Sequence, residues 1–93
     1  MFIGVLQVHL HIQAAQSLKE KRLVLKGLIE RIRSHFNVSV SELADQDLWQ
    51  SAILGVAAIG NEKKYLNQVL DKVLDLIRKE NRAEVLDSQL EML

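Results

Sequence analysis

Hydrophobic residues recur with two different periods along this 93-residue chain, and the order of those periods limits the folds that it can adopt. In the first segment the period is two, because apolar and polar residues alternate as they do in a half-buried strand. One face of this strand carries Leu6, Val8, Leu10 and Ile12, and the other face carries Gln7, His9 and His11.

The next segment has helical spacing. Ser17 begins a capping box, because its hydroxyl can accept a hydrogen bond from the third helical N–H while Glu20 reaches back to the cap. We expect a helix from Leu18 to about Asn37, with Asn37 as its C-terminal cap. Gly27 costs this helix about 1 kcal/mol relative to alanine, which a close approach to another backbone would explain. The apolar stripe consists of Leu18, Val24, Leu25, Leu28, Ile29, Ile32 and Phe36.

The second half of the chain changes period again. A strand in which Val38 and Val40 alternate with serines precedes the segment ADQD, which breaks it. Leu48–Ile59 is small and apolar on both faces, as is typical of a central strand. Asn61 is expected to cap a second helix that KENRA ends, and Val85–Leu90 is expected to form a short acidic edge strand. The second helix has an apolar stripe of Leu66, Val69, Leu70, Val73, Leu74 and Ile77.

The order strand, helix, strand, strand, helix, strand in about 90 residues predicts one α+β domain over residues 1–93. Its simplest arrangement is the ferredoxin-like βαββαβ sandwich, a four-stranded antiparallel sheet with two helices on one face. Apolar residues make up 48% of the chain, which is ample for a core of this size. The other face of the sheet stays uncovered, and this fold commonly binds RNA, a ligand or a second subunit there.

Composition excludes several classes of site. The absence of cysteine rules out disulfides, Cys-ligated zinc, iron–sulfur clusters and a thiol nucleophile. The longest nearly apolar run, Ala52–Gly60, is far shorter than the roughly 20 residues of a membrane span, and the N-terminus lacks the basic segment of a signal peptide. We therefore expect a cytoplasmic protein with no membrane contact and no cofactor. Twelve basic and twelve acidic residues balance, so attraction to phosphate requires a local patch.

One such patch lies on the first predicted helix. At 100° per residue, four of its cations fall within about 60° of one another, on a ridge beside the apolar stripe. These cations could contact successive phosphates, and a solvated face whose long side chains cover apolar edges explains the same pattern. The basic ridge consists of Lys19, Arg22, Lys26 and Arg33, is interrupted by Glu30, and has Lys21 and Arg31 nearby.

Two histidines and the only tryptophan are candidates on the uncovered sheet face. His9 and His11 share that face with Gln7, and their spacing could chelate a metal. A third ligand could come from Glu42, Asp45, Asp47 or His35, but nothing in the sequence brings one of them close. A polar stripe is the simpler interpretation. Trp49 falls on the same face if the third strand turns its apolar residues to the helices, and it could then stack a base. Packing at the core or strand end and a subunit contact are the alternatives.

Evidence for catalysis is missing. Asp45 and Asp47 could act as paired carboxylates, but both are ordinary turn formers ahead of the third strand. No GxGxxG, GxxxxGK[ST], GxSxG or HExxH string occurs. We therefore expect a protein that is not an enzyme. The third alternative is a small-molecule or metal-dependent enzyme that uses these two aspartates together with His9 and His11.

The segments FIGVLQVHLHI, SLKEKRLVLKGLIERIRSHFNVSVSEL and DLWQSAILGVAAIGN, taken together, resemble the YlxP-like family of small bacterial proteins, a domain of unknown function. The resemblance extends from about Phe2 to Leu90. It implies a ferredoxin-like sandwich. Members are often encoded beside translation-initiation and ribosome-maturation factors, which implies a role with RNA or the ribosome, and no established catalytic residues exist to be transferred.

The leading prediction is a cytoplasmic protein that contacts structured RNA or the ribosome through the basic ridge, with Trp49 as a stacking contact. With about four phosphates neutralised, the logarithm of its affinity should fall with the logarithm of salt concentration with a slope near −3 to −4. The alternative is a homo-oligomeric protein-interaction module that uses the open sheet face or an edge strand.

Overall fold

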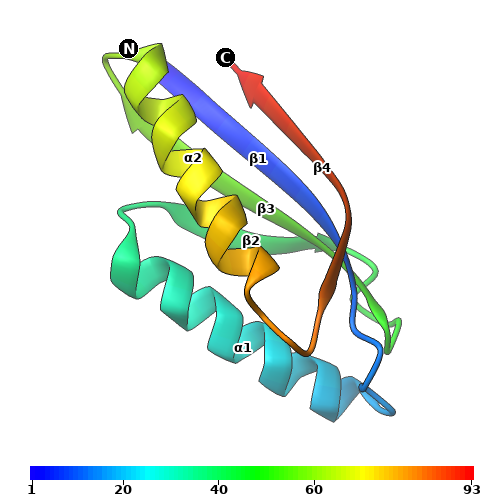
Figure 1. Ribbon diagram of the computed structural model, residues 1–93. Coiled ribbons are helices and arrows are strands. Elements are labelled where there is room, and N and C mark those ends of the chain that lie inside the picture. The colour runs from blue at the N-terminus through cyan, green and yellow to red at the C-terminus, as the bar shows by residue number, and fades with distance from the viewer.

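Six elements form a sheet layer and a helix layer in the computed structural model, which describes residues 1–93 (Figure 1). The four strands are antiparallel in the order β2-β3-β1-β4, and the two helices pack over the same face. The predicted ferredoxin-like α+β fold is therefore confirmed, with the last strand at a sheet edge. In chain order the elements are β1 (Phe2–His11), α1 (Leu18–His35), β2 (Ser39–Ala44), β3 (Ser51–Gly60), α2 (Lys63–Arg78) and β4 (Glu84–Met92).

The core lies between the sheet and the helices. Alternate residues of β1 and β3 point into it, and each helix contributes its apolar stripe. Helix α2 lies so close to β1 that a Cβ atom on Gly4 would come within 2.8 Å of Leu70 Cδ1. Burying each large side chain contributes roughly 1.5–3 kcal/mol. The most deeply buried of them are Leu6, Val8, Leu10, Ile12, Leu28, Ile32, Leu54, Val56, Leu66, Leu70 and Ile77.

The two central strands pair without interruption, whereas both edge strands contain a register shift. Strand β1 pairs with β3 from Phe2, opposite Gly60, to His11, opposite Ser51. Strand β2 shifts between Glu42 and Ala44, and β4 shifts opposite His9 and Leu10. Because each shift adds a residue to the edge strand, Leu43 in β2 and Leu86 in β4 have no paired residue opposite them.

The boundaries of α1 agree with the prediction at its start and differ at its end. Ser17 Oγ accepts a hydrogen bond from the Glu20 N–H at 3.1 Å, and Glu20 Oε2 accepts from the Gln16 N–H, one residue before the cap. The cap at the other end is Phe36 and not Asn37. Phe36 is extended and packs against the core, so its side chain ends the helix one residue earlier than predicted.

Three further predictions are wrong. The N-cap of α2 is Glu62, with no side-chain hydrogen bond, and not Asn61. Gly27 has no backbone close to it, because a Cβ atom there would meet only Arg82 Nη2, at 3.9 Å. Strand β3 begins at residue 51 and not at Leu48, because a turn closed by the Leu48 N–H and the Asp45 carbonyl occupies the preceding residues.

Neither helix combines the length and apolar composition that a membrane crossing requires.

Candidate nucleic-acid interface

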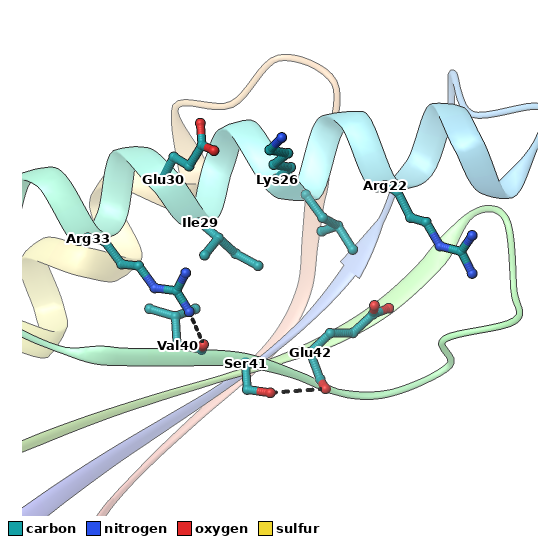
Figure 2. A pocket seen from close by; sticks show the side chains of 9 residues that line it. Arg22, Lys26, Ile29, Glu30, Arg33, Val40, Ser41 and Glu42 are labelled. Atoms are coloured by element: carbon teal, nitrogen blue, oxygen red, sulfur yellow. Dashed lines mark hydrogen bonds between the residues drawn. The ribbon is translucent and has the colours of Figure 1, made fainter.

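An open groove of about 450 Å³ runs between α1 and β2 (Figure 2). Its floor is apolar, because part of the α1 stripe and one residue of β2 lie between the two elements. Cationic side chains of α1 stand along it. The α1–β2 groove is lined by Arg22, Leu25, Lys26, Ile29, Glu30 and Arg33 from α1, and by Val40, Ser41 and Glu42 from β2.

The guanidinium groups stand at opposite ends of this groove. Figure 2 shows Arg22 and Arg33 reaching from α1 toward β2, with Lys26 between them on the outer side of the helix. The two arginines are eleven positions apart in α1, or about 16 Å along the helix axis. Arg33 Nη2 donates to the Val40 carbonyl at 2.9 Å, whereas Arg22 and Lys26 are exposed and have no hydrogen-bonding or ionic partner. Two of the three groove cations are therefore free to bind an anion.

The two acidic residues of the groove do not cancel this charge. Glu42 Oε2 lies 2.9 Å from the ammonium of Lys21, so its negative charge is already compensated. Glu30 lies on the outer side of α1 beside Lys26 in Figure 2, so the uncompensated charges of the groove are one carboxylate and three cations. The α1–β2 groove therefore carries an excess of positive charge on a chain whose net charge is zero.

Lys21 is fully buried, which corrects its predicted place among the nucleic-acid contacts. Its side chain is 1% exposed, and its ammonium pairs with Glu42 and donates to the Asp45 carbonyl. The spacing in the sequence contained the signal. Lys21 precedes Val24, Leu25 and Leu28 by three, four and seven residues, which places it on the buried stripe of α1.

Arg31 also lies apart from the groove. It faces the end of α2, where its guanidinium pairs with Glu80, and Glu80 in turn accepts hydrogen bonds from Arg82. We call these three residues the Glu80 cluster. Hydrogen bonding by the Arg82 side chain is the main cause that lowers the pKa of Glu80 to about 2, and burial opposes it. The same contact raises the pKa of Arg82. Arg31 therefore connects α1 to the segment between α2 and β4 through a carboxylate that stays ionised.

On the open sheet face, a serine connects two of the sequence candidates. Ser51 Oγ donates to Asp45 Oδ2 at 2.7 Å and lies 3.1 Å from His9 Nε2. Because the serine hydroxyl has one hydrogen and Asp45 receives it, His9 Nε2 is the donor in the second bond. Gln7 and His11 flank His9 on this face without joining the network, and no group of three acidic or imidazole side chains is placed to hold a metal ion.

Trp49 lies outside the strand in which it was predicted. It is 54% exposed, in the loop of residues 45–50 that connects β2 to β3, so it does not share a strand face with Ser51 and Ile53. Neighbouring Leu48 is 53% exposed, and Asp47 is exposed without a partner. The indole therefore lies at the end of the sheet, about half exposed, and is not part of the buried core. We call residues 45–50 the Trp49 loop.

Both ends of the Trp49 loop are tied to other segments, which sequence reasoning missed. At its end, the Gln50 carbonyl accepts from the Ile12 N–H at 2.9 Å, and its side-chain amide donates to the carbonyls of Gln13 and Ala15. At its start, Asp45 has a positive φ of 65° and accepts through both its side chain and its carbonyl. Apart from Ser51, which donates to the Asp45 carboxylate, these partners are distant in sequence, so no local pattern indicates them.

Comparisons with known proteins identify relatives along nearly the whole chain. Residues 3–90 match the family described as "Protein of unknown function (DUF503)". The "Uncharacterized protein YlxP" of Bacillus subtilis (strain 168) is 41% identical over 75 residues, which are 81% of this chain and 82% of that protein. Among solved structures, "De novo designed protein Foldit4" is similar with a TM-score of 0.52 and 15% identity, covering 98% of this chain and 93% of that chain. The last similarity concerns the fold alone.

Proposed function

This chain belongs to the DUF503 family, and from the charge and shape of the α1–β2 groove we propose that it is a non-enzymatic protein that binds structured RNA, free or in the ribosome. The groove residues Arg22, Lys26 and Arg33 hold phosphates of the RNA backbone. Lys19 extends the same ridge by one helical turn toward the start of α1.

The observation that carries the proposal is the pair of guanidinium groups at the two ends of the groove. Guanidinium presents several donors in a plane and binds phosphate through two parallel hydrogen bonds, which makes arginine a preferred phosphate ligand. Arg22 has no other partner, and the single bond from Arg33 to Val40 leaves further N–H donors available. Two such groups, carried by helix positions about 16 Å apart along the axis, can contact well-separated phosphates of one strand.

The salt dependence expected from this groove is smaller than the basic run alone suggests. Lys21 is buried, Arg31 is paired, and Lys19 does not line the groove, so about three cations remain there to displace counterions. With three phosphates neutralised, the logarithm of the affinity should fall with the logarithm of salt concentration with a slope of about −2 to −3.

Charge reversal tests the proposal. The tagged protein is first sedimented from lysate on a sucrose gradient at low and high salt, where we expect it to travel with a ribosomal subunit only at low salt. The variant Arg22→Glu/Lys26→Glu should then lose at least about tenfold in affinity for isolated RNA. The matched control Lys64→Glu/Lys72→Glu makes the same change in net charge on exposed lysines of α2 and should bind as the wild type does.

Two results would overturn the proposal. One is a salt-independent affinity, which would mean that phosphate contacts do not contribute. The other is an equal loss in the groove variant and the α2 control, which would mean that only net charge matters.

A second candidate function, self-association, is favoured by the apolar residues of the open sheet face. Ile59 is 64% exposed, and Val5 and Ala57 line a shallow hollow of about 190 Å³ with Leu43, whose side chain lies over Gly55. A second copy of the chain would cover this face. Sedimentation equilibrium at micromolar concentration tests it: a dimer that Val5→Glu dissociates supports the candidate, and a monomer rejects it.

A further inference from the structure

We propose that the buried Lys21 is a positioning residue for the Trp49 loop, and that it holds this loop beside the α1–β2 groove so that Trp49 stacks on an unpaired base of the bound RNA. The inference rests on the proposed function and narrows its ligand. The preferred RNA has an unpaired base next to the phosphates that the groove holds, as in a hairpin loop or a bulge, and is not a continuous duplex.

The first step is the cost of burying a lysine. An ammonium removed from water is retained in a fold only where a charge and hydrogen-bond acceptors compensate it. Lys21 has two such partners: the Glu42 carboxylate at 2.9 Å in β2, and the carbonyl of Asp45 at the start of the Trp49 loop. One ammonium therefore joins α1, β2 and the loop.

The second step is the conformation that this contact holds. Asp45 has a φ of 65°, in the left-handed region that residues with a side chain rarely adopt. Its carbonyl accepts from both Lys21 and the Leu48 N–H, and its carboxylate accepts from Ser51. The turn that precedes Trp49 is thus fixed from α1 and from β3 at once.

The third step is what the fixed loop displays. Gln50 holds the far end of the loop through its hydrogen bonds to the β1–α1 connection. The residues between the two ties include Leu48 and Trp49, and both side chains are more than half exposed. A large indole on a loop held at both ends is a preorganised surface, so binding a base there loses little conformational entropy.

The fourth step is the position of the loop relative to the groove. Glu42 both lines the groove and pairs with Lys21, and the loop begins three residues later. Arg22, which follows Lys21 in α1, reaches toward β2 at this end of the groove (Figure 2). An indole can stack only on a base whose face is accessible, so a phosphate at Arg22 and a base at Trp49 require an unpaired nucleotide.

Trp49 fluorescence provides the test, because Trp49 is the only tryptophan of the chain. The probes are an RNA hairpin with an unpaired loop and a fully paired duplex with the same number of phosphates. We expect the wild type to bind the hairpin about 5- to 100-fold more tightly than the duplex, with quenching of the indole by the hairpin alone. Trp49→Ala should remove this preference.

The variant that isolates positioning is Lys21→Met/Glu42→Leu. It replaces the ion pair with apolar groups of similar length, which keeps the fold, and it removes the donor to the Asp45 carbonyl. Glu42 lines the groove, but its charge is compensated by Lys21, so removing both leaves the charge of the groove unchanged. We therefore expect this variant to lose hairpin preference and quenching while its salt slope stays near −2 to −3. In the free protein, acrylamide quenching of Trp49 and exchange of the Leu48 amide should both increase. The control Val73→Ala, buried on α2, should alter neither.

The outcomes separate this inference from the proposed function. If the double variant keeps the hairpin preference and the wild-type amide exchange, Lys21 does not position the loop, although the groove still binds RNA. If the wild type binds both RNAs equally, Trp49 does not stack on a base. If the wild type binds neither RNA, the proposed function itself fails, and the inference fails with it.

Discussion

Two charged sites connect α1 to the rest of the molecule, and they bury opposite charges. At one end of the helix, the ammonium of Lys21 is 1% exposed and its partner Glu42 is 20% exposed. At the other end, the carboxylate of Glu80 is 5% exposed, while Arg31 and Arg82 are 48% and 53% exposed. The first site removes a cation from the protein surface, and the second leaves its cations at the surface around a buried anion.

The two sites differ in the number of partners that compensate the buried charge. Glu80 has two arginine partners, so the loss of either leaves its charge compensated by the other. Lys21 is the only cation that forms an ion pair with Glu42, and Glu42 Oε2 is buried with no other hydrogen-bond partner. An unpaired charge costs far more free energy when it is buried than when it is in water. A single substitution should therefore lower the free energy of unfolding more at the Lys21–Glu42 pair than at Glu80 and its two arginines.

The largest expected effect is that of Lys21→Met. It leaves the Glu42 carboxylate partly buried without a cation, so the free energy of unfolding should fall by about 3 kcal/mol. Urea denaturation at pH 7 measures this change. Adding Glu42→Leu should restore most of the loss, and a double variant no more stable than the single one would show that the carboxylate is not the cause.

Glu80→Gln is expected to have the next largest effect, about 2 kcal/mol at pH 7. The pKa of Glu80 is lowered from 4.5 to about 2, so its carboxylate stabilises the fold fully above pH 4.5. This contribution is lost as the pH falls through about 2, because the protonated group pairs no better than an amide. Thermal unfolding across this range should show the variant and the wild type converging at the acidic end, and a constant difference would contradict the prediction.

Asp45→Ala should cost about 1–2 kcal/mol, because alanine is strained at positive φ and cannot accept from Ser51. Asp45→Gly also removes the hydrogen bond from Ser51, but glycine adopts a positive φ without strain. The glycine variant should therefore be more stable than the alanine variant. Chemical denaturation of the pair separates the two causes. Equal stabilities would mean that the backbone conformation at this residue is not maintained in solution.

The smallest effect is expected for Arg31→Met, at or below about 1 kcal/mol. Its guanidinium is half exposed, and Arg82 still compensates Glu80 when Arg31 is removed. Urea denaturation of this variant beside Lys21→Met compares the two ends of α1 directly. If Arg31→Met lowered the free energy of unfolding as much as Lys21→Met does, the second arginine would not protect Glu80. The proposed difference between the two sites would then be wrong.

The fold could be predicted because β1 and both helices have a clear period. Strict alternation in β1 and helical spacing in α1 and α2 give the order of the elements, and that order has few compact arrangements. Boundaries were less accurate where a single side chain decides them. Phe36 ends α1 because it packs against the core, and Asn37, the better cap by residue type, has no part in it.

The candidate site could be predicted only in part. The ridge of Arg22, Lys26 and Arg33 follows from helical geometry, and the structure places these three residues along one groove. Helical spacing also puts Lys21 on the buried stripe of α1. Because lysine is usually exposed, its residue type predicts a position beside the basic ridge at the surface. The Trp49 loop depends on a positive φ at a residue other than glycine and on partners 24 and more residues away, and neither is visible in local sequence.

The register shifts at the two edges of the sheet have a consequence for solubility. An edge strand offers unpaired N–H and C=O groups that can recruit strands of other molecules, and proline is a common protection against this. The chain has no proline, but the unpaired Leu43 and Leu86 interrupt both edges. An edge strand that is interrupted by a bulge cannot form a long, continuous row of hydrogen bonds with a strand of another molecule. We therefore expect these two bulges to protect a crowded solution of this protein from strand-to-strand aggregation.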